Sequence, residues 1–331
     1  MLFHPAVIAL LLASGLVSVM LLYSSYYGYQ VLRRWDLTSG SEVQLALERR
    51  TYLISTIITY AFGFQTLSLF LYLFTADHLH TFFVGAMCAA GTLNVNGYGY
   101  PALVLKIVNF MLAGAWLSVN YVDNRAYDYP LVRKKYLFLL IITPLVLAET
   151  AALANYFLRL DPAIITSCCG SLFSANTGSI TSEIVSLPAK PLGIFFGLSI
   201  VAAIASGLFF YFRGKGAYLF SVIAAATFVV AVLSLISFIS PYIYELPTHH
   251  CPFCILQAEY GFVGYPLYVA LLVGGASGIS VGALMPFRNA ASLREIIPPV
   301  QRKLAIACVT CYAAFALIVM YRIITSNLVL S

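Results

Sequence analysis

The sequence predicts an all-α fold, a polytopic integral membrane bundle of about eight transmembrane helices. Its composition is the first observation: 61% of the residues are hydrophobic, only 9% are charged, and the mean hydropathy is +0.92. Soluble domains carry about 25% charged residues, so water is not the solvent for most of this chain. The second observation is that apolar runs of about 20 residues, long enough to cross a bilayer, follow one another along the sequence. We therefore expect residues 1–331 to form a single transmembrane domain.

The predicted spans are apolar runs bounded by charged or turn-forming residues. They occupy residues 5–29, 51–75, 101–122, 136–158, 191–212, 217–240, 261–286 and 303–325. The first run lacks both a preceding Lys or Arg and a small-residue cleavage site. We therefore expect it to be retained as a helix and not removed as a signal peptide.

Two local patterns add detail to these spans. The apolar stretch 81–93 is too short to cross a bilayer and precedes a turn-rich segment, which predicts a re-entrant or interfacial half-helix. In the seventh run, Gly274, Gly278 and Gly282 recur at four-residue intervals. This spacing predicts a helix face without side chains, which lets a neighbouring helix approach closely.

Basic residues gather in alternate linkers and so predict the topology. The linkers after the first, third, fifth and seventh runs hold most of the 18 Lys and Arg residues. Because basic residues favour the cytoplasmic side, we expect these linkers in the cytoplasm and both termini on the non-cytoplasmic side. The net charge of +6 reflects such clusters, for example Arg133, Lys134 and Lys135, and does not indicate nucleic-acid binding. A bacterial inner membrane is the expected location.

Cysteines provide the main functional clue. Five of the seven fall in the predicted outer loops, and none falls in the inner loops: Cys88, Cys168, Cys169, Cys251 and Cys254. A cysteine in a membrane protein is often only a small apolar residue. A Cys-Cys pair and a Cys-x-x-Cys motif on one face are better explained by shared chemistry. That chemistry is thiol exchange, soft-metal binding or a structural disulfide.

The Cys-x-x-Cys motif comes just before the seventh run, so we expect its sulfurs near the membrane surface, at or close to a helix N-terminus. There the helix dipole, with His249 and His250 alongside, would favour the thiolate form of the two cysteines. The thiolate is the form that attacks disulfides and binds soft metals. The motif is therefore the first candidate for a reactive pair.

The segment Cys251-Pro252-Phe253-Cys254, followed by Gln257 and an apolar run, resembles the bacterial DsbB family of disulfide oxidases. More loosely, it is similar to the vitamin K epoxide reductase family. The residue after that Gln is Ala, where the DsbB family has Arg. The resemblance implies that Cys251 and Cys254 are a redox couple that passes electrons from substrate thiols to a quinone. A periplasmic thioredoxin-like protein is the expected partner.

The remaining cysteines extend this hypothesis. Cys168 and Cys169 lie in a long loop rich in Ser, Thr and Gly. Because a disulfide between neighbours is strained, we expect them to exchange with the Cys-x-x-Cys motif, to bind a metal or to brace two loops. Cys88 is a further candidate participant. Cys308 and Cys311 share one face of the eighth run, where they either pack in the core or carry electrons inward.

Histidines support a rival hypothesis. His78 and His80 end the second run on the outer side, and with His249, His250 and the motif cysteines they would form a site for copper, zinc or mercury. Axial ligation of haem is also open. The protein is then a soft-metal binding or transport protein. A third alternative is a non-catalytic membrane subunit whose disulfides brace its loops.

Two ionisable residues lie inside predicted spans. Lys106 in the third run and Glu149 in the fourth reach nearly the same depth in the bilayer, because the two runs are antiparallel. Charges at such depth are expensive and are functional candidates by default. We expect the two to form a buried charge pair that serves either proton handling or structure.

Overall fold

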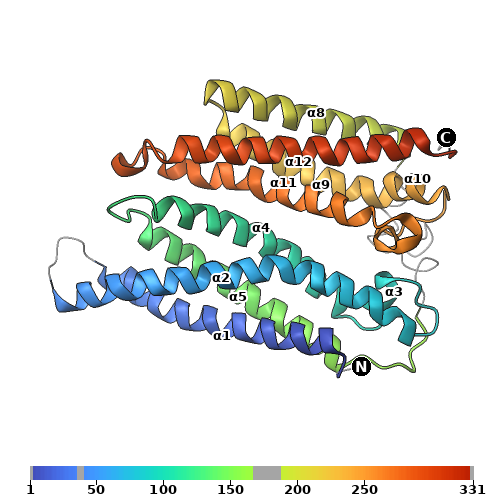
Figure 1. Cartoon of the computed structure of the whole chain (residues 1–331), viewed down its shortest axis with the longest axis horizontal. Helices are drawn as coiled ribbons and strands as arrows, with labels where there is room; N and C mark the ends of the chain where they lie inside the picture. Colours follow the sequence, from blue (N-terminus) through green and yellow to red (C-terminus); the bar gives the residue numbers. More distant parts are fainter. Residues whose placement is uncertain (1–2, 36–40, 167–187, 329–331) are drawn as a thin grey trace. The chain divides into compact units, whose positions relative to one another are not determined.

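The computed structural model describes residues 3–35, 41–166 and 188–328. These residues are helical with no β-strand, which confirms the predicted all-α class (Figure 1). Eight of the described helices are long and apolar enough to cross a membrane, as the sequence predicts. The main helices are α1 (Pro5–Arg34), α2 (Glu42–His78), α4 (Gly99–Asp123), α5 (Val132–Leu158), α8 (Ala189–Arg213), α9 (Ala217–Ser234), α11 (Gly264–Leu284) and α12 (Ile297–Thr325). Insertion in a membrane and the side on which the termini lie stay predictions.

The described chain divides into two compact units. Unit 1 comprises Met1–Leu73, Asn96–Leu160 and Ala283–Gln301, and unit 2 comprises Phe74–Val95, Asp161–Gly282 and Arg302–Ser331. The single transmembrane domain stays a prediction.

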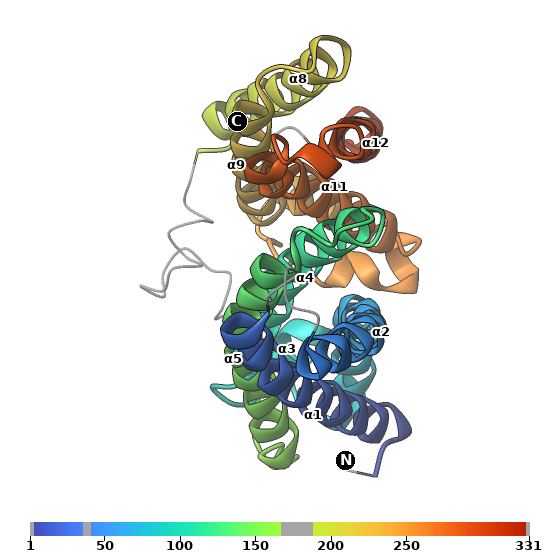
Figure 2. The ribbon, with the colours of Figure 1, turned by 90° about the vertical axis from the view of Figure 1, so that its left-hand side faces the viewer.

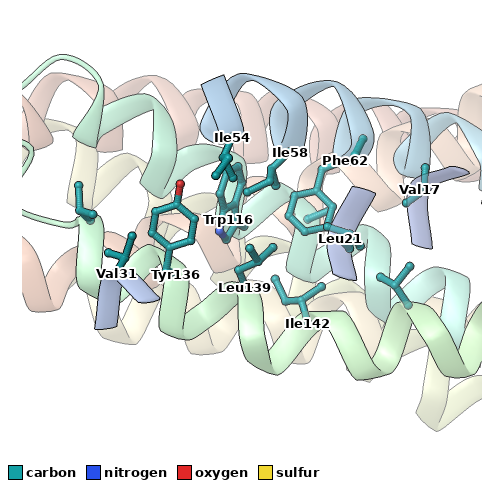
Figure 3. Packing of buried hydrophobic residues seen from close by; sticks show 14 of the residues in the cluster. Val17, Leu21, Val31, Ile54, Ile58, Phe62, Trp116, Tyr136, Leu139 and Ile142 are labelled. Carbon is teal, nitrogen blue, oxygen red and sulfur yellow. The ribbon is translucent and has the colours of Figure 1, made fainter. Parts of the chain in front are cut away.

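Unit 1 is built on α1, α4, α5 and the first part of α2, which lie side by side (Figures 1 and 2). Its apolar core contains the fully buried rings of Phe62, Trp116 and Tyr136 (Figure 3). The centroids of the Phe62 and Trp116 rings lie 5.2 Å apart in an edge-to-face contact, a favourable aromatic geometry. Two hydroxyl pairs join α1 to α5. The side-chain oxygens of Ser18 and Thr150 lie 2.8 Å apart, and those of Ser25 and Thr143 are separated by the same distance. Small polar residues of this kind are typical of helix contacts in lipid.

In unit 2, α8, α9, α11 and α12 pack together (Figure 2). The glycine face of α11 lies against its neighbours at very short range, as the sequence predicts. A Cβ atom on Gly278 would lie 2.4 Å from the Cβ of Ala224 on α9 and 3.1 Å from the Sγ of Cys308 on α12. The absence of a side chain at Gly278 is therefore what allows these helices to pack so closely.

Two elements differ from the sequence prediction. Residues 81–93 do not form one half-helix: the structure has a 3-10 helix at Leu79–Phe82 (η1) and a short helix at Ala89–Leu93 (α3). Gly85, with a backbone φ of 87°, interrupts the segment, because this conformation cannot continue a right-handed helix. Helix α2 begins at Glu42, well before the apolar run, because the polar residues that precede the run also form helix readily.

Single cysteines introduced at Asp161 and Glu295 test the orientation. Both residues are exposed, the first in a predicted outer loop and the second in a predicted inner loop. With Cys168 and Cys169 replaced by Ser, an impermeant maleimide added to intact spheroplasts is expected to label Asp161→Cys and not Glu295→Cys. Labelling of Glu295→Cys after lysis controls for reactivity. The reverse pattern would show the opposite orientation.

Candidate three-cysteine site

Three thiols from two separate segments meet in unit 2. Cys88 precedes α3, and Cys251 and Cys254 belong to the loop before α11. The Sγ atoms of Cys88 and Cys251 lie 3.5 Å apart, and all three Sγ atoms lie within 4.8 Å of one another. The exposed fractions of Cys88, Cys251 and Cys254 are 0%, 0% and 4%. The result is a buried cluster of three sulfurs, which we call the three-cysteine site.

Hydrogen bonds of two side chains join the two segments that carry these cysteines. Asp77, at the end of α2, accepts hydrogen bonds from the backbone N–H of Ala89 at 3.2 Å and from Nε2 of Gln257 at 3.3 Å. Gln257 also donates to the backbone carbonyl of Met87 at 2.8 Å. Through Asp77 and Gln257, the position of Cys88 is fixed relative to the Cys-x-x-Cys loop. Sequence reasoning did not single out Asp77, which stands alone near the end of an apolar run.

Two tyrosines hold the backbone of the Cys-x-x-Cys motif. The Tyr244 hydroxyl donates to the carbonyl of Cys251 at 2.5 Å, and the Tyr268 hydroxyl donates to the carbonyl of Pro252. Because buried carbonyls need donors, these bonds stabilise the motif in one conformation without using the thiols. Nothing in the sequence pattern distinguishes these two among the 23 tyrosines.

His250 binds the same loop to a π-helical turn. Its Nδ1 lies 3.1 Å from the carbonyl oxygen of Ile236 and 3.0 Å from that of Ser237, in the π turn Leu235–Ile239. Both partners are acceptors, so Nδ1 must carry the proton. π turns occur often at functional sites, and here one supplies carbonyls that orient the residue next to Cys251.

The motif precedes the seventh span, as expected, but it does not lie close to the N-terminus of that helix. Cys254 opens a three-residue 3-10 helix, Cys254–Leu256, and α11 begins only at Gly264. Between them the chain turns at Gly261 and Phe262, whose φ values are 66° and 54°. These left-handed residues end the local helix, so the dipole of α11 does not act on the thiols at close range.

The four histidines do not join the sulfurs. Among the described residues, the three-cysteine site is the only group of three or more potential ligands close enough to share a metal ion, and it contains no histidine. Nδ1 of His78 lies 3.1 Å from the carbonyl oxygen of Phe74, and Nδ1 of His80 contacts that of Asp77. His249 packs its ring against Tyr244. The histidine part of the predicted metal site is therefore not assembled.

The other cysteines lie elsewhere. Cys168 and Cys169 fall outside the described residues. Thr166, which precedes them, is bonded to the Cys88 segment: its N–H donates to the carbonyl of Val84 at 3.0 Å and its hydroxyl to that of Gly91 at 2.9 Å. Cys308 and Cys311 both belong to α12. Cys308 is buried against the glycine face of α11, and Cys311 is half-buried. Neither belongs to the three-cysteine site.

The structure brings Lys106 and Glu149 together in unit 1. Lys106 Nζ lies 2.7 Å from Glu149 Oε1, and both side chains are fully buried. Asn109 Nδ2 donates to Glu149 Oε2 at 2.6 Å, Gln65 Nε2 donates to the same oxygen, and Lys106 donates to Ser68 at 3.0 Å. These hydrogen bonds offset part of the cost of burying two charges.

A second buried charge pair escaped sequence reasoning. Lys135 Nζ lies 2.7 Å from Asp123 Oδ2, and it also donates to Asn120 Oδ1 at 3.1 Å and to Ser55 Oγ at 3.4 Å. The sequence places Lys135 in a basic cluster that is expected to face the cytoplasm. Its neighbour Lys134 is exposed, whereas Lys135 lies on the opposite side of the first turn of α5 and is buried.

No protein-family model matches the chain, and comparisons with curated proteins and with solved structures give no match either.

Proposed function

We propose that the chain is a membrane thiol–disulfide oxidoreductase whose reactive centre is the three-cysteine site. The supporting observation is the 3.5 Å separation of the Cys88 and Cys251 sulfurs, with Cys254 Sγ close to both. Thiol–disulfide exchange needs three sulfurs, because one thiolate attacks a disulfide formed by the other two. In this proposal, Cys251 and Cys254 of the Cys-x-x-Cys motif supply two of the three sulfurs, and Cys88 supplies the third.

The exchange transfers a disulfide and leaves the number of electrons unchanged. In the oxidised site, Cys251 and Cys254 are bonded, and the Cys88 thiolate attacks the sulfur of Cys251. A new Cys88–Cys251 bond forms as the Cys251–Cys254 bond breaks, and Cys254 leaves as a thiolate that takes up a proton. A substrate dithiol attacking either bridge leaves as a disulfide, and two cysteines of the site receive its two electrons and two protons.

A quinone is the electron acceptor that the DsbB resemblance implies, and a periplasmic thioredoxin-like protein is the donor. Cys168 and Cys169 are proposed to carry the exchange between that partner and the buried site. Thr166, two residues before Cys168 in the sequence, donates its N–H and its hydroxyl to the carbonyls of Val84 and Gly91 on the Cys88 segment. Because the exchanging pair belongs to the same chain as the site, its attack is intramolecular in this proposal.

The second candidate function is binding or transport of a soft metal ion. It is favoured by the burial and mutual proximity of three sulfurs, since thiolates at about 2.3 Å from one zinc or copper ion lie about 4 Å apart. The described residues offer no histidine as a fourth ligand at the site. A three-coordinate ion with sulfur ligands only is the form that this candidate takes, and Cu(I) suits such ligands.

Single Cys→Ser variants distinguish the two functions. If exchange occurs, Cys254→Ser is expected to accumulate a Cys88–Cys251 disulfide, and Cys88→Ser a Cys251–Cys254 disulfide, when the reduced protein is oxidised in detergent. Differential alkylation followed by mass spectrometry identifies each bridge. Cys308→Ser is the matched control, because this buried cysteine lies outside the site and its loss should leave both bridges unchanged.

The same variants have a different signature for a metal site. Each of the three substitutions would then lower the bound metal measured on purified reduced protein, and no internal disulfide would accumulate under mild oxidation. If the wild-type thiols neither oxidise nor exchange across a series of thiol–disulfide redox buffers, the oxidoreductase proposal is wrong.

A further inference from the structure

One end of unit 1 carries a group of exposed basic side chains. They belong to the end of α1, the start of α2 and the stretch that joins α4 to α5, and these helix ends lie on the same side of the unit (Figure 1). All of them are exposed, and we call them the basic surface: Arg33, Arg34, Arg49, Arg50, Arg125, Arg133 and Lys134.

Side-chain contacts bring these segments together. A guanidinium nitrogen of Arg133 donates to the backbone carbonyl of Trp35, which joins the start of α5 to the end of α1. Nη1 of Arg50 lies 3.4 Å from the Tyr27 hydroxyl, which joins the start of α2 to the last turns of α1. The basic surface is therefore one tertiary feature of unit 1, although its residues come from separate stretches of sequence.

The positive charge of the basic surface is not neutralised within the described protein. In the part of the chain that the structure describes, the ion pairs are those of Lys106 and Lys135, and neither residue belongs to this surface. Apart from these pairs, the same segments contain only three described carboxylates, those of Glu42, Glu48 and Asp128. Basic residues therefore outnumber acidic ones, and the charge favours an anionic partner.

Exposed tyrosines hold two of these cations in place. The guanidinium carbon of Arg33 lies 4.7 Å from the centre of the Tyr29 ring, and that of Arg125 lies 4.5 Å from the centre of the Tyr121 ring. Tyr29 and Tyr121 are 48% and 45% exposed. A cation–π contact keeps the guanidinium against the ring and leaves its N–H groups free to donate at the edge. Tyrosine is enriched where the headgroups of a bilayer meet the hydrocarbon.

Exposed apolar side chains continue from the basic surface along α1. Leu16, Val19 and Leu22 are 60%, 65% and 50% exposed. From Arg33 to Leu22 the helix rises about 16 Å, close to half of the roughly 30 Å hydrocarbon core of a bilayer. A partner that covers both parts needs a negative charge at one end and an apolar chain behind it. An anionic phospholipid has this structure, whereas a soluble phosphate does not.

We propose that the basic surface binds the headgroups of anionic phospholipids. The phosphate oxygens accept hydrogen bonds from the guanidinium groups, and the acyl chains lie along the exposed apolar side chains of α1. The proposal needs neither the chemistry of the three-cysteine site nor a particular orientation of the chain, because all the residues involved belong to unit 1.

Native mass spectrometry of the detergent-purified chain tests the preference for anionic lipid. Dioleoyl phosphatidylglycerol is expected to bind about tenfold more tightly than dioleoyl phosphatidylcholine, which has the same acyl chains and no net charge. The difference should shrink as the salt concentration rises, because the headgroup contacts are exposed to water. Equal affinities for the two lipids would overturn the proposal.

Paired variants test whether the basic surface is the binding site. Arg33→Gln/Arg50→Gln should weaken phosphatidylglycerol binding about fivefold for each arginine removed, the loss expected for one basic residue at an anionic lipid surface. Arg213→Gln/Lys215→Gln is the matched control, because it removes the same charge from exposed positions in unit 2 and should leave the affinity unchanged. Equal losses in the two double variants would show a general attraction to positive charge, and the proposal would be wrong.

Competition distinguishes a lipid from a free phosphate. Glycerol 3-phosphate carries a phosphate without acyl chains, so at the same concentration as phosphatidylglycerol it is expected to leave lipid binding unchanged. Displacement of the lipid under these conditions would show that the basic surface is a site for a soluble phosphate and would refute the lipid proposal.

Discussion

Replacement of Glu149 by Ala is expected to destabilise unit 1 by about 3–5 kcal/mol, because it leaves the Lys106 ammonium buried without its counter-charge. Lys106 and Glu149 have no exposed side-chain surface, so neither charge can turn to solvent. Lys106→Ala should cost a similar amount. The double variant should cost less than the sum of the two single changes, because it strands no charge.

The double-mutant cycle is measured by unfolding in detergent, followed by tryptophan fluorescence, because both tryptophans, Trp35 and Trp116, belong to the core of the same unit. Glu295→Ala is the matched control, since this carboxylate is exposed and its loss should change stability by less than about 0.5 kcal/mol. Additive losses in the cycle would show that the two charges do not stabilise one another.

Gly85→Ala is expected to release the Thr166 segment from the chain around Cys88. Gly85 has a backbone φ of 87°, and a Cβ on it would lie 2.0 Å from the backbone oxygen of Thr166. A side chain in the left-handed region costs about 1–2 kcal/mol, and an overlap with a fixed backbone atom adds about 1–3 kcal/mol. The loss of the contacts between Thr166 and residues 84–91 should therefore accompany the loss of stability.

Gly261→Ala provides the control for backbone strain alone. Gly261 has a φ of 66°, and nothing lies within 4 Å of the Cβ that would be added. Both tryptophans lie in unit 1, so the readout in unit 2 is the alkylation rate of Cys88 in the folded protein, measured by mass spectrometry. Gly85→Ala should raise this rate more than Gly261→Ala does. Equal rates would show that the Thr166 contact does not protect the site.

The helices could be predicted from the sequence because a membrane span is a local property. Twenty or so apolar residues must form a helix in lipid, whatever they pack against. Charge and turn residues then mark the approximate ends. Helix α2 shows the limit, because its first turns are polar and the apolar run does not reveal them. The broken segment 79–93 depends on Gly85, whose conformation is set by the chain packed against it.

The candidate site could be predicted only in part. The sequence was enough to predict the Cys-x-x-Cys motif as a reactive pair and the side of the membrane on which it is expected. It was also enough to predict that Lys106 and Glu149 lie at nearly the same depth. The meeting of Cys88 with Cys251 depends on Asp77 and Gln257, which act across a long sequence separation. The burial of Lys135 depends on Asp123, at the C-terminal end of the preceding helix. Such tertiary pairings leave no periodic signal in one sequence.

The two charge pairs have a consequence for how the chain is made. Helix α4 carries Lys106 and Asp123, and α5 carries their partners, so neither helix alone has its charges neutralised. A lone charge near a helix centre costs about 2.5–3.5 kcal/mol on insertion scales. If the chain inserts in a membrane as the sequence predicts, the short linker 124–131 would allow the two helices to enter together as one hairpin, with both pairs formed. The same side chains would oppose the entry of each helix alone and favour the joint entry of the two.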